Sequence, residues 1–168
     1  MSTPENAPTL HLADLDLPTV VSLVGSAVDR RVLDSLTAAG IHGLRTGHGH
    51  VVQRLVAGPS TVGEIADAVG VTQQAVSKTV RELVDLGYVE RSSDPLDRRR
   101  RPLALTPAGR RAVRVARRAR TALHDEVAAS VTTRDLAAAR RVLGQLARAL
   151  GLDDEIARRS VPAPPDRT

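Results

Sequence analysis

Two groups of polar side chains stand out in the middle of this sequence. The first has the spacing of one helix face and combines amides, a hydroxyl and cations: Gln73, Gln74, Ser77, Lys78 and Arg81. Amides and hydroxyls can hydrogen-bond base edges, and cations can bind phosphates. The second is a run of four arginines, Arg98 to Arg101, directly after Asp97. Such a run, seen alone, is more often a solvated turn than a binding surface.

Three histidines form a further candidate site, in or beside a glycine-rich loop: His42, His48 and His50. Because the chain has no cysteine, a zinc ion there would also need a carboxylate, for which the candidates are Asp34, Asp125 and Glu126. A Gly-His-Gly-His segment is more often a polar linker. We therefore predict no metal and no other cofactor, and keep a histidine site as the minor alternative.

Composition limits the classes of function. The chain has 168 residues and a formal net charge of +5, and Lys78 is the single lysine among its 24 basic residues. Arginine makes bidentate contacts with phosphates and guanine, which favours nucleic acid as a partner. No phosphate-binding loop or nucleophile elbow is recognisable, so we do not expect an enzyme. The absence of a signal peptide and of a long apolar run predicts a soluble, cytoplasmic protein without membrane contact.

Predicted helices surround the polar groups. Apolar periodicity and capping signals place helices at about 18–39, 51–56, 61–70, 72–87, 106–130 and 132–151. Thr61 and Glu64 form a capping box, Thr72 caps the next helix, and Thr132 or Thr133 caps the last. The helix at 72–87 has a buried stripe, which leaves the amides and cations on its exposed face.

The apolar period changes to two after Gly87. Tyr88–Arg91 and Leu103–Leu105 are predicted strands, and the turn between them carries the arginine run. Two short helices followed by an arginine-tipped hairpin make a winged helix-turn-helix, so the predicted fold class is mostly α (α+β). In this position, contact with DNA becomes the favoured interpretation of both polar groups.

The segment GPSTVGEIADAVGVTQQAVSKTVRELVDLGYVERSSDPLDRRRRPLALTPAG closely resembles the MarR family of bacterial transcription regulators. The similarity runs from His50 to Gly109, and its most specific part is DP-x-DRR followed by L-x-LT-x-x-G. The resemblance implies a homodimer whose N- and C-terminal helices interlock. Each recognition helix, with Thr72 and the polar face at 73–81, would enter a major groove of a pseudo-palindromic operator in double-stranded DNA. Each wing would reach into an adjacent minor groove.

The resemblance also assigns roles within the wing. Asp97 matches an aspartate that holds the wing arginines in place, and Arg98 and Arg99 match the wing-tip pair. Arg100 is an extra arginine that would add to DNA contact. Pro102 departs from the family pattern, because it cannot donate to the strand ladder and so leaves the inner register of the wing open.

The implied organisation has five segments: a flexible arm (1–16), an N-terminal dimerisation helix and loop (17–45), the winged helix-turn-helix DNA-binding lobe (46–109), C-terminal dimerisation helices (110–160) and a disordered tail (161–168). In the last helix, an apolar stripe is predicted to lie inside: Leu136, Val142, Leu143, Leu146 and Leu150. Relatives bind small acids where the dimer helices meet the DNA-binding lobe. A small-molecule effector beside the histidine loop is therefore a further hypothesis.

The predicted function is a homodimeric, sequence-specific DNA-binding transcription regulator, with repression favoured over activation. The alternative is a winged-helix module that binds a protein instead of DNA. A protein-binding surface should present apolar anchors. The exposed face at 73–81 has none, which favours DNA.

Replacing Arg99 by alanine should weaken operator binding by roughly 1–3 kcal/mol and make its salt dependence shallower, because one arginine contact in the minor groove is lost. Titration of labelled operator DNA at several salt concentrations measures both effects. An unchanged affinity would exclude Arg99 from the contact.

Overall fold

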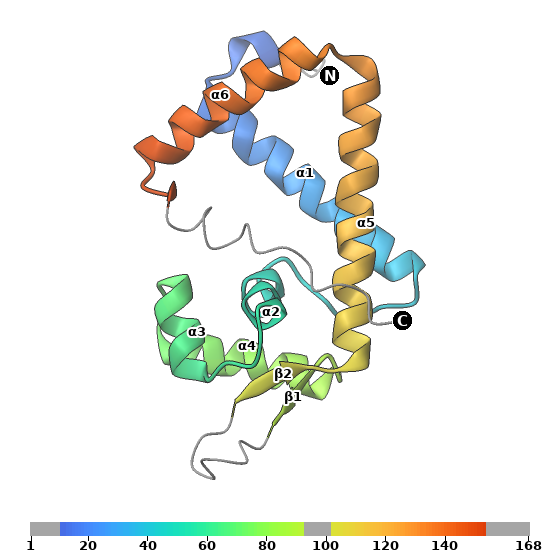
Figure 1. Cartoon of the computed structure of the whole chain (residues 1–168), viewed down its shortest axis with the longest axis vertical. Helices are drawn as coiled ribbons and strands as arrows, with labels where there is room; N and C mark the ends of the chain where they lie inside the picture. Colours follow the sequence, from blue (N-terminus) through green and yellow to red (C-terminus); the bar gives the residue numbers. More distant parts are fainter. Residues whose placement is uncertain (1–10, 93–101, 154–168) are drawn as a thin grey trace, which may run out of the picture.

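The structure is a computed structural model and describes residues 11–92 and 102–153. Its elements are a 3-10 turn at Leu12–Asp14, α1 at Leu17–Ala38, α2 at His48–Val56, α3 at Val62–Val69, α4 at Gln73–Asp85, β1 at Val89–Arg91, β2 at Leu103–Leu105, α5 at Pro107–Ser130 and α6 at Thr133–Ala149. Figure 1 shows α1, α6 and much of α5 at one end, and α2 to α4 with the sheet at the other. No helix within these ranges is long and apolar enough to cross a membrane.

Local capping sets most helix starts. The Thr61 hydroxyl accepts a hydrogen bond from the Glu64 amide at 3.3 Å, and the Glu64 carboxylate accepts one from the Thr61 amide at 2.8 Å. Thr72 caps α4, and Thr132, rather than Thr133, caps α6. These contacts satisfy amides that would otherwise lack a partner at a helix start. The predicted capping signals are confirmed.

One predicted boundary is wrong. Within the segment 1–16, for which the sequence predicts a flexible arm, residues 12–14 form a 3-10 turn in which the Asp14 carboxylate accepts a hydrogen bond from the His11 amide at 3.1 Å. The sequence also places Tyr88 in a strand, but its amide bonds the Leu83 carbonyl at 2.9 Å and so completes the end of α4. The predicted tail, 161–168, lies outside the described residues.

The hydrophobic core is centred between α2, α3, α4 and the sheet, which together we call the winged-helix lobe (residues 48–105), and it extends to Val32 and Leu36 of α1 and Ala112 of α5. Ile65, Leu83 and Leu103 each have 0% of their surface exposed. Full burial of an aliphatic side chain of this size contributes roughly 1.5–3 kcal/mol. Aliphatic side chains from several elements therefore build this lobe without any phenylalanine or tryptophan in the chain.

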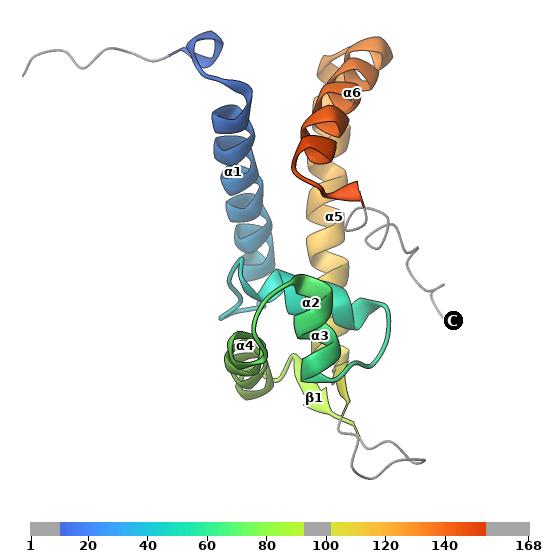
Figure 2. The same cartoon turned by 90° about the vertical axis from the view of Figure 1, so that its left-hand side faces the viewer.

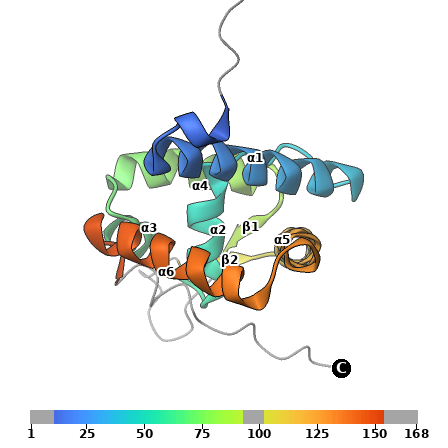
Figure 3. The ribbon, with the colours of Figure 1, turned by 90° about the horizontal axis from the view of Figure 1, so that it is seen from above.

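The helices at the other end bury little within the chain. α1 buries only Val32 and Leu36, and α6 buries none of its side chains. The sequence predicts an inward-facing stripe on α6, of which Leu136 and Leu146 are half-buried, but Leu143 is 46% exposed, and Val142 and Leu150 are exposed too. The reason is geometric, because α6 and α1 run along opposite sides of the molecule (Figures 2 and 3). The apolar side of α6 thus remains open to solvent in the single chain.

The strand pairing continues to Pro102, although proline has no backbone N–H to donate. β1 and β2 are antiparallel and pair Val89 with Leu105, and Arg91 with Leu103. At the next position the Ser92 amide donates to the Pro102 carbonyl at 2.7 Å. Proline supplies only the acceptor that this position needs, so the pairing continues to the base of the wing.

The first turn of α5 rests directly on the start of β1. The Thr106 amide donates to the Tyr88 carbonyl at 3.1 Å, and a Cβ placed on Gly109 would lie 2.1 Å from the same oxygen. Only glycine allows this approach, because the obstacle is backbone rather than a movable side chain. This contact explains the glycine of the L-x-LT-x-x-G motif.

Gly109→Ala should destabilise the fold by at least about 1–3 kcal/mol, the usual cost of forcing extra volume into a packed site. Urea unfolding followed by circular dichroism measures the change. Gly144→Ala is the matched control, because a Cβ there meets nothing within 4 Å in the chain and alanine favours a helix. Equal stability of the Gly109 variant and the parent would contradict the close contact.

Candidate nucleic-acid interface and adjoining cavity

The polar face predicted on the second helix of the motif lies on α4, within the winged-helix lobe. Four of its members are exposed, namely Gln73, Gln74, Lys78 and Arg81, and Ser77 is half-buried. The Thr72 hydroxyl accepts a hydrogen bond from the Ala75 amide at 3.2 Å, so its first role is to cap the helix. The structure therefore brings the predicted amides, hydroxyl and cations together on one helix.

The opposite side of α4 determines which residues are exposed. Val76, Val80 and Leu83 are each at most 2% exposed and form the buried stripe of the helix. The preceding turn is made by Gly70, whose φ of 72° is a left-handed conformation that favours glycine. The Gln73 side chain lies beside the start of α3, where its amide nitrogen would be 3.5 Å from a Cβ on Gly63. The orientation of the polar face thus follows from packing and turn geometry.

The predicted wing tip falls outside the described residues, which resume at Pro102. Asp97, Arg98, Arg99 and Arg100 all lie in that gap, so their roles stay predictions. The two strands that lead to them are paired up to Ser92 and Pro102.

The three histidines of the candidate metal or effector site differ in exposure and in their contacts. His42 is exposed, and its backbone carbonyl accepts a hydrogen bond from the Tyr88 hydroxyl at 2.8 Å. His50 is exposed on α2, whereas His48 is 4% exposed. Of the carboxylates considered with them, Glu126 pairs with Arg31 at 2.6 Å. Across residues 11–92 and 102–153, no group of three histidine or acidic side chains is placed to hold a metal ion.

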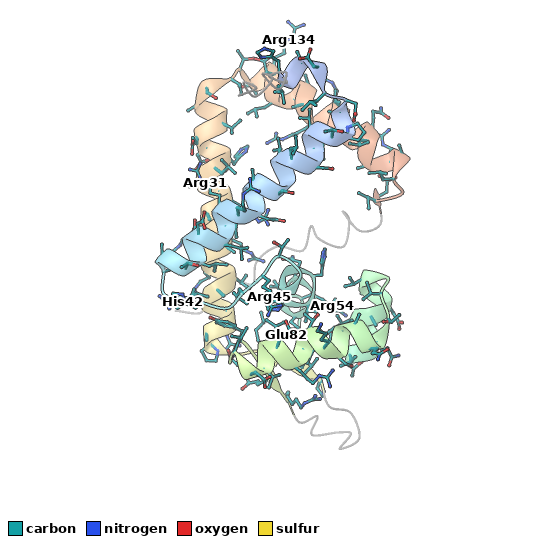
Figure 4. The ribbon with its side chains drawn as sticks, turned by 180° about the vertical axis from the view of Figure 1, so that it is seen from behind. Arg31, His42, Arg45, Arg54, Glu82 and Arg134 are labelled. Carbon is teal, nitrogen blue, oxygen red and sulfur yellow. The ribbon has the colours of Figure 1, made fainter. Side chains whose placement is uncertain are left out.

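His48 is instead one end of a buried contact with α4. Its Nδ1 accepts a hydrogen bond from the Arg45 amide at 3.3 Å, so its Nε2 carries the proton and donates to Glu82 Oε2 at 2.9 Å. The Arg45 guanidinium lies 3.7 Å from the same carboxylate oxygen, and Figure 4 shows Arg45 and Glu82 at the loop-facing side of α4. No local pattern in the sequence indicates this contact, since its partners are 34 residues apart.

The hydrogen bond from His48 is the main reason that the pKa of Glu82 lies below its usual value. Partial burial opposes this shift, and the positive charges of Arg45 and Lys78 add to it. The Glu82 carboxylate is thus kept ionised on the side of α4 that faces the loop, one helical turn from Lys78 of the polar face.

A cavity of about 210 Å³ lies where α1, α2 and α5 meet, next to His48. Its walls are mostly aliphatic, with Val32, Leu36, Leu44, Val52 and Val113 among them. Its polar lining includes Arg45, His48, Arg117 and an Arg120–Asp29 ion pair of 3.1 Å. The lining contains no aromatic ring apart from the imidazole of His48. The space suits a small molecule with an apolar body and a polar or anionic group.

Glu82→Gln should destabilise the protein at neutral pH, and this difference from the parent should shrink in acid. A lowered folded-state pKa stabilises the fold above about pH 4.3, where the unfolded carboxyl is ionised, and this contribution is lost as the pH falls. Urea unfolding of both proteins across this range gives the comparison. Asp85→Asn, at the exposed end of the same helix, is the control. A difference that grows on acidification would contradict the assigned interaction.

Comparison with known proteins gives matches for both sequence and fold. Residues 42–100 match a family model described as MarR family. The fold is similar to FabT of Streptococcus pneumoniae in complex with DNA, with 21% identity, 81% of this chain and 98% of that chain covered, and a TM-score of 0.64. It is also similar to the apo form of MarR from E. coli, at 22% identity, 79% and 96% coverage and a TM-score of 0.58.

A third similar structure is S. aureus MepR bound to ethidium bromide, with 18% identity, 82% of this chain and 99% of that chain covered, and a TM-score of 0.58. Identities this low show a shared fold. No curated protein matches the sequence. The matched segment contains α2, α3, α4 and β1. Over this segment, which forms most of the winged-helix lobe, the chain is similar to the MarR family.

Proposed function

We propose that this protein is a DNA-binding transcription regulator that places α4 in a major groove and its wing arginines in the adjacent minor groove. The observation that carries the proposal is the exposed face of α4, where Gln73, Gln74, Lys78 and Arg81 project from a helix whose other side is locked into the core. Such a helix can enter a groove without losing its own packing. FabT, a protein of the same fold, has been solved in complex with DNA.

The regulator acts as a homodimer. In the single chain, large apolar side chains are exposed at the end away from the winged-helix lobe: Leu17, Leu23, Val24, Val127, Val131, Val142, Leu143 and Leu150. Burying them against a second copy gains roughly 25 cal/mol for each Å² removed from water. A twofold dimer would present two α4 helices to half-sites about 34–36 Å apart, and thus read a pseudo-palindrome. Occupying such a site excludes other proteins from it, so we propose repression.

The alternative, a winged-helix module for a protein partner, has less support. Protein-binding surfaces usually centre on buried aromatic or aliphatic anchors. On the described part of the lobe, the exposed large apolar residues are Val71 and Leu86, which lie before and after α4 rather than on its polar face.

The cavity between α1, α2 and α5 is the proposed effector site. It joins the helices that would form the dimer to the lobe that would bind DNA. A small molecule there can act by favouring one relative tilt of these two parts, which changes the spacing of the two recognition helices. MepR, which has a similar fold, has been solved with ethidium bromide bound.

Selection of bound fragments from a random DNA library tests the proposed function. The purified protein should enrich an inverted repeat. Arg81→Ala should then lower affinity for it by roughly 1–3 kcal/mol if Arg81 contacts a base, or reduce the salt dependence by about one charge if it contacts phosphate. Arg134→Ala, on the exposed start of α6 far from α4 in Figure 4, is the matched control. Recovery of no common sequence would favour the protein-binding alternative.

Leu143→Asp should abolish operator binding by separating the subunits, because a carboxylate would enter the proposed apolar interface. Light scattering measures the mass of the assembly, and titration with the sequence selected from the DNA library measures binding. Since Leu143 is 46% exposed in the single chain, the variant should keep its folded circular dichroism spectrum. A variant that remains dimeric would show that α6 lies outside the interface.

A further inference from the structure

The loop between α1 and α2 and the first residue of α2 contact α4 and the residues after it at three places. The Tyr88 hydroxyl donates to the His42 carbonyl at 2.8 Å. The Leu86 side chain lies against Gly43, where a Cβ would be 2.5 Å from its Cδ2 atom. His48, the first residue of α2, donates to Glu82 on α4. The loop is therefore held along the C-terminal half of α4 and the residues that follow it.

The His48 attachment differs from the other two because it lines the cavity. His48, Arg45, Thr46 and Gly49 all contribute to the cavity wall. The imidazole accepts from the Arg45 amide on one side and donates to Glu82 on the other. One buried side chain thus connects the cavity wall to the helix that carries the polar face.

We infer that His48 is the positioning residue through which occupancy of the cavity is transmitted to α4. A molecule that fills the cavity presses on the turn from Arg45 to His48. That turn either moves α4 slightly through the Nε2–H···Glu82 hydrogen bond or breaks this bond, while Val76, Val80 and Leu83 keep the helix packed in the core. Shifts of about 1–2 Å between packed helices are enough to change how a dimer presents its binding elements. The consequence for DNA rests on the proposed function, but the mechanical link does not.

The two hydrogen bonds of the imidazole can be removed separately. The amide nitrogen of glutamine reaches about as far as Nε2, so His48→Gln keeps a donor for Glu82. The amide oxygen of asparagine lies about where Nδ1 does, so His48→Asn keeps the acceptor for the Arg45 amide and loses the donor to α4. If His48 were merely a structural core residue, the two variants would behave alike.

A bulky side chain can stand in for the ligand, since Ala116 of α5 lines the cavity. Ala116→Phe would fill part of the space in three backgrounds: the parent, His48→Gln and His48→Asn. The chain contains no cysteine, so spin labels at Asp85→Cys on α4 and Arg134→Cys on α6 would be the only ones. Labelled chains are mixed with excess unlabelled protein, so that pulsed electron paramagnetic resonance measures the distance between the two labels within one chain.

Ala116→Phe should shift the distance between the labels by about 1–2 Å in the parent and in His48→Gln, and leave it unchanged in His48→Asn. An identical response in all three backgrounds, or no shift in any, would overturn the inference. Circular dichroism verifies folding in each case. Where the phenylalanine variant is not folded, Ala116→Leu provides a smaller surrogate for the same comparison.

Operator affinity separates this inference from the proposed function. Ala116→Phe should change the affinity by about fivefold or more in the parent and in His48→Gln, and by much less in His48→Asn. A His48-dependent distance shift in a protein that selects no DNA sequence would support the connection from the cavity to α4 through His48 and would contradict the proposed function. Sequence-specific binding with the same response in every background would support the proposed function and contradict the role of His48.

Discussion

The packing of α4 against the rest of the winged-helix lobe is the interaction on which the other features depend. Val76, Val80 and Leu83 lie almost fully buried on one side of a helix only 13 residues long. With three anchors at helical spacing, the helix cannot rotate without exposing apolar surface. The positions of the polar face, of Glu82 toward the loop and of Tyr88 after the helix all follow from this one orientation.

The other end of the molecule is incomplete by comparison. α1 and α5 are joined near the lobe by buried apolar residues, Val32, Leu36 and Ala112, and farther along by two ion pairs, Arg31–Glu126 and Arg120–Asp29. Exposed pairs of this kind contribute about 0–1 kcal/mol each, far less than a buried core. The apolar side chains of α1 and α6 are consequently left exposed in one chain. In the proposed homodimer, these side chains would be buried against the second copy.

The cavity lies at the boundary between these two unequal parts. Its walls come from α1 and α5 on one side and from the α1–α2 loop and α2 on the other. The loop moves with the lobe, because Tyr88 and Leu86 both contact it. A site at such a boundary is well suited to report on the relative position of the two parts, since any change in their tilt must alter its shape.

Local signals in the sequence were sufficient for the elements and for the polar face. A cap joins residues three apart, as Thr61 and Glu64 do, so it can be read without knowledge of the fold. The same holds for the periodic stripe of α4. The contacts made by Tyr88, Gly109 and His48 could not be read in this way. The Tyr88 hydroxyl bonds a carbonyl 46 residues away, and Gly109 is required only because α5 begins against the Tyr88 carbonyl.

The sequence by itself therefore determined the winged helix-turn-helix, its helix starts and the residues of its exposed face, because these depend on neighbours along the chain. The tertiary structure decided that the apolar side of α6 stays open and that the histidines separate. It also decided that His48 joins Glu82 beside a cavity. These outcomes depend on the angles at which helices pack, and such angles are set by many side chains at once rather than by any local pattern.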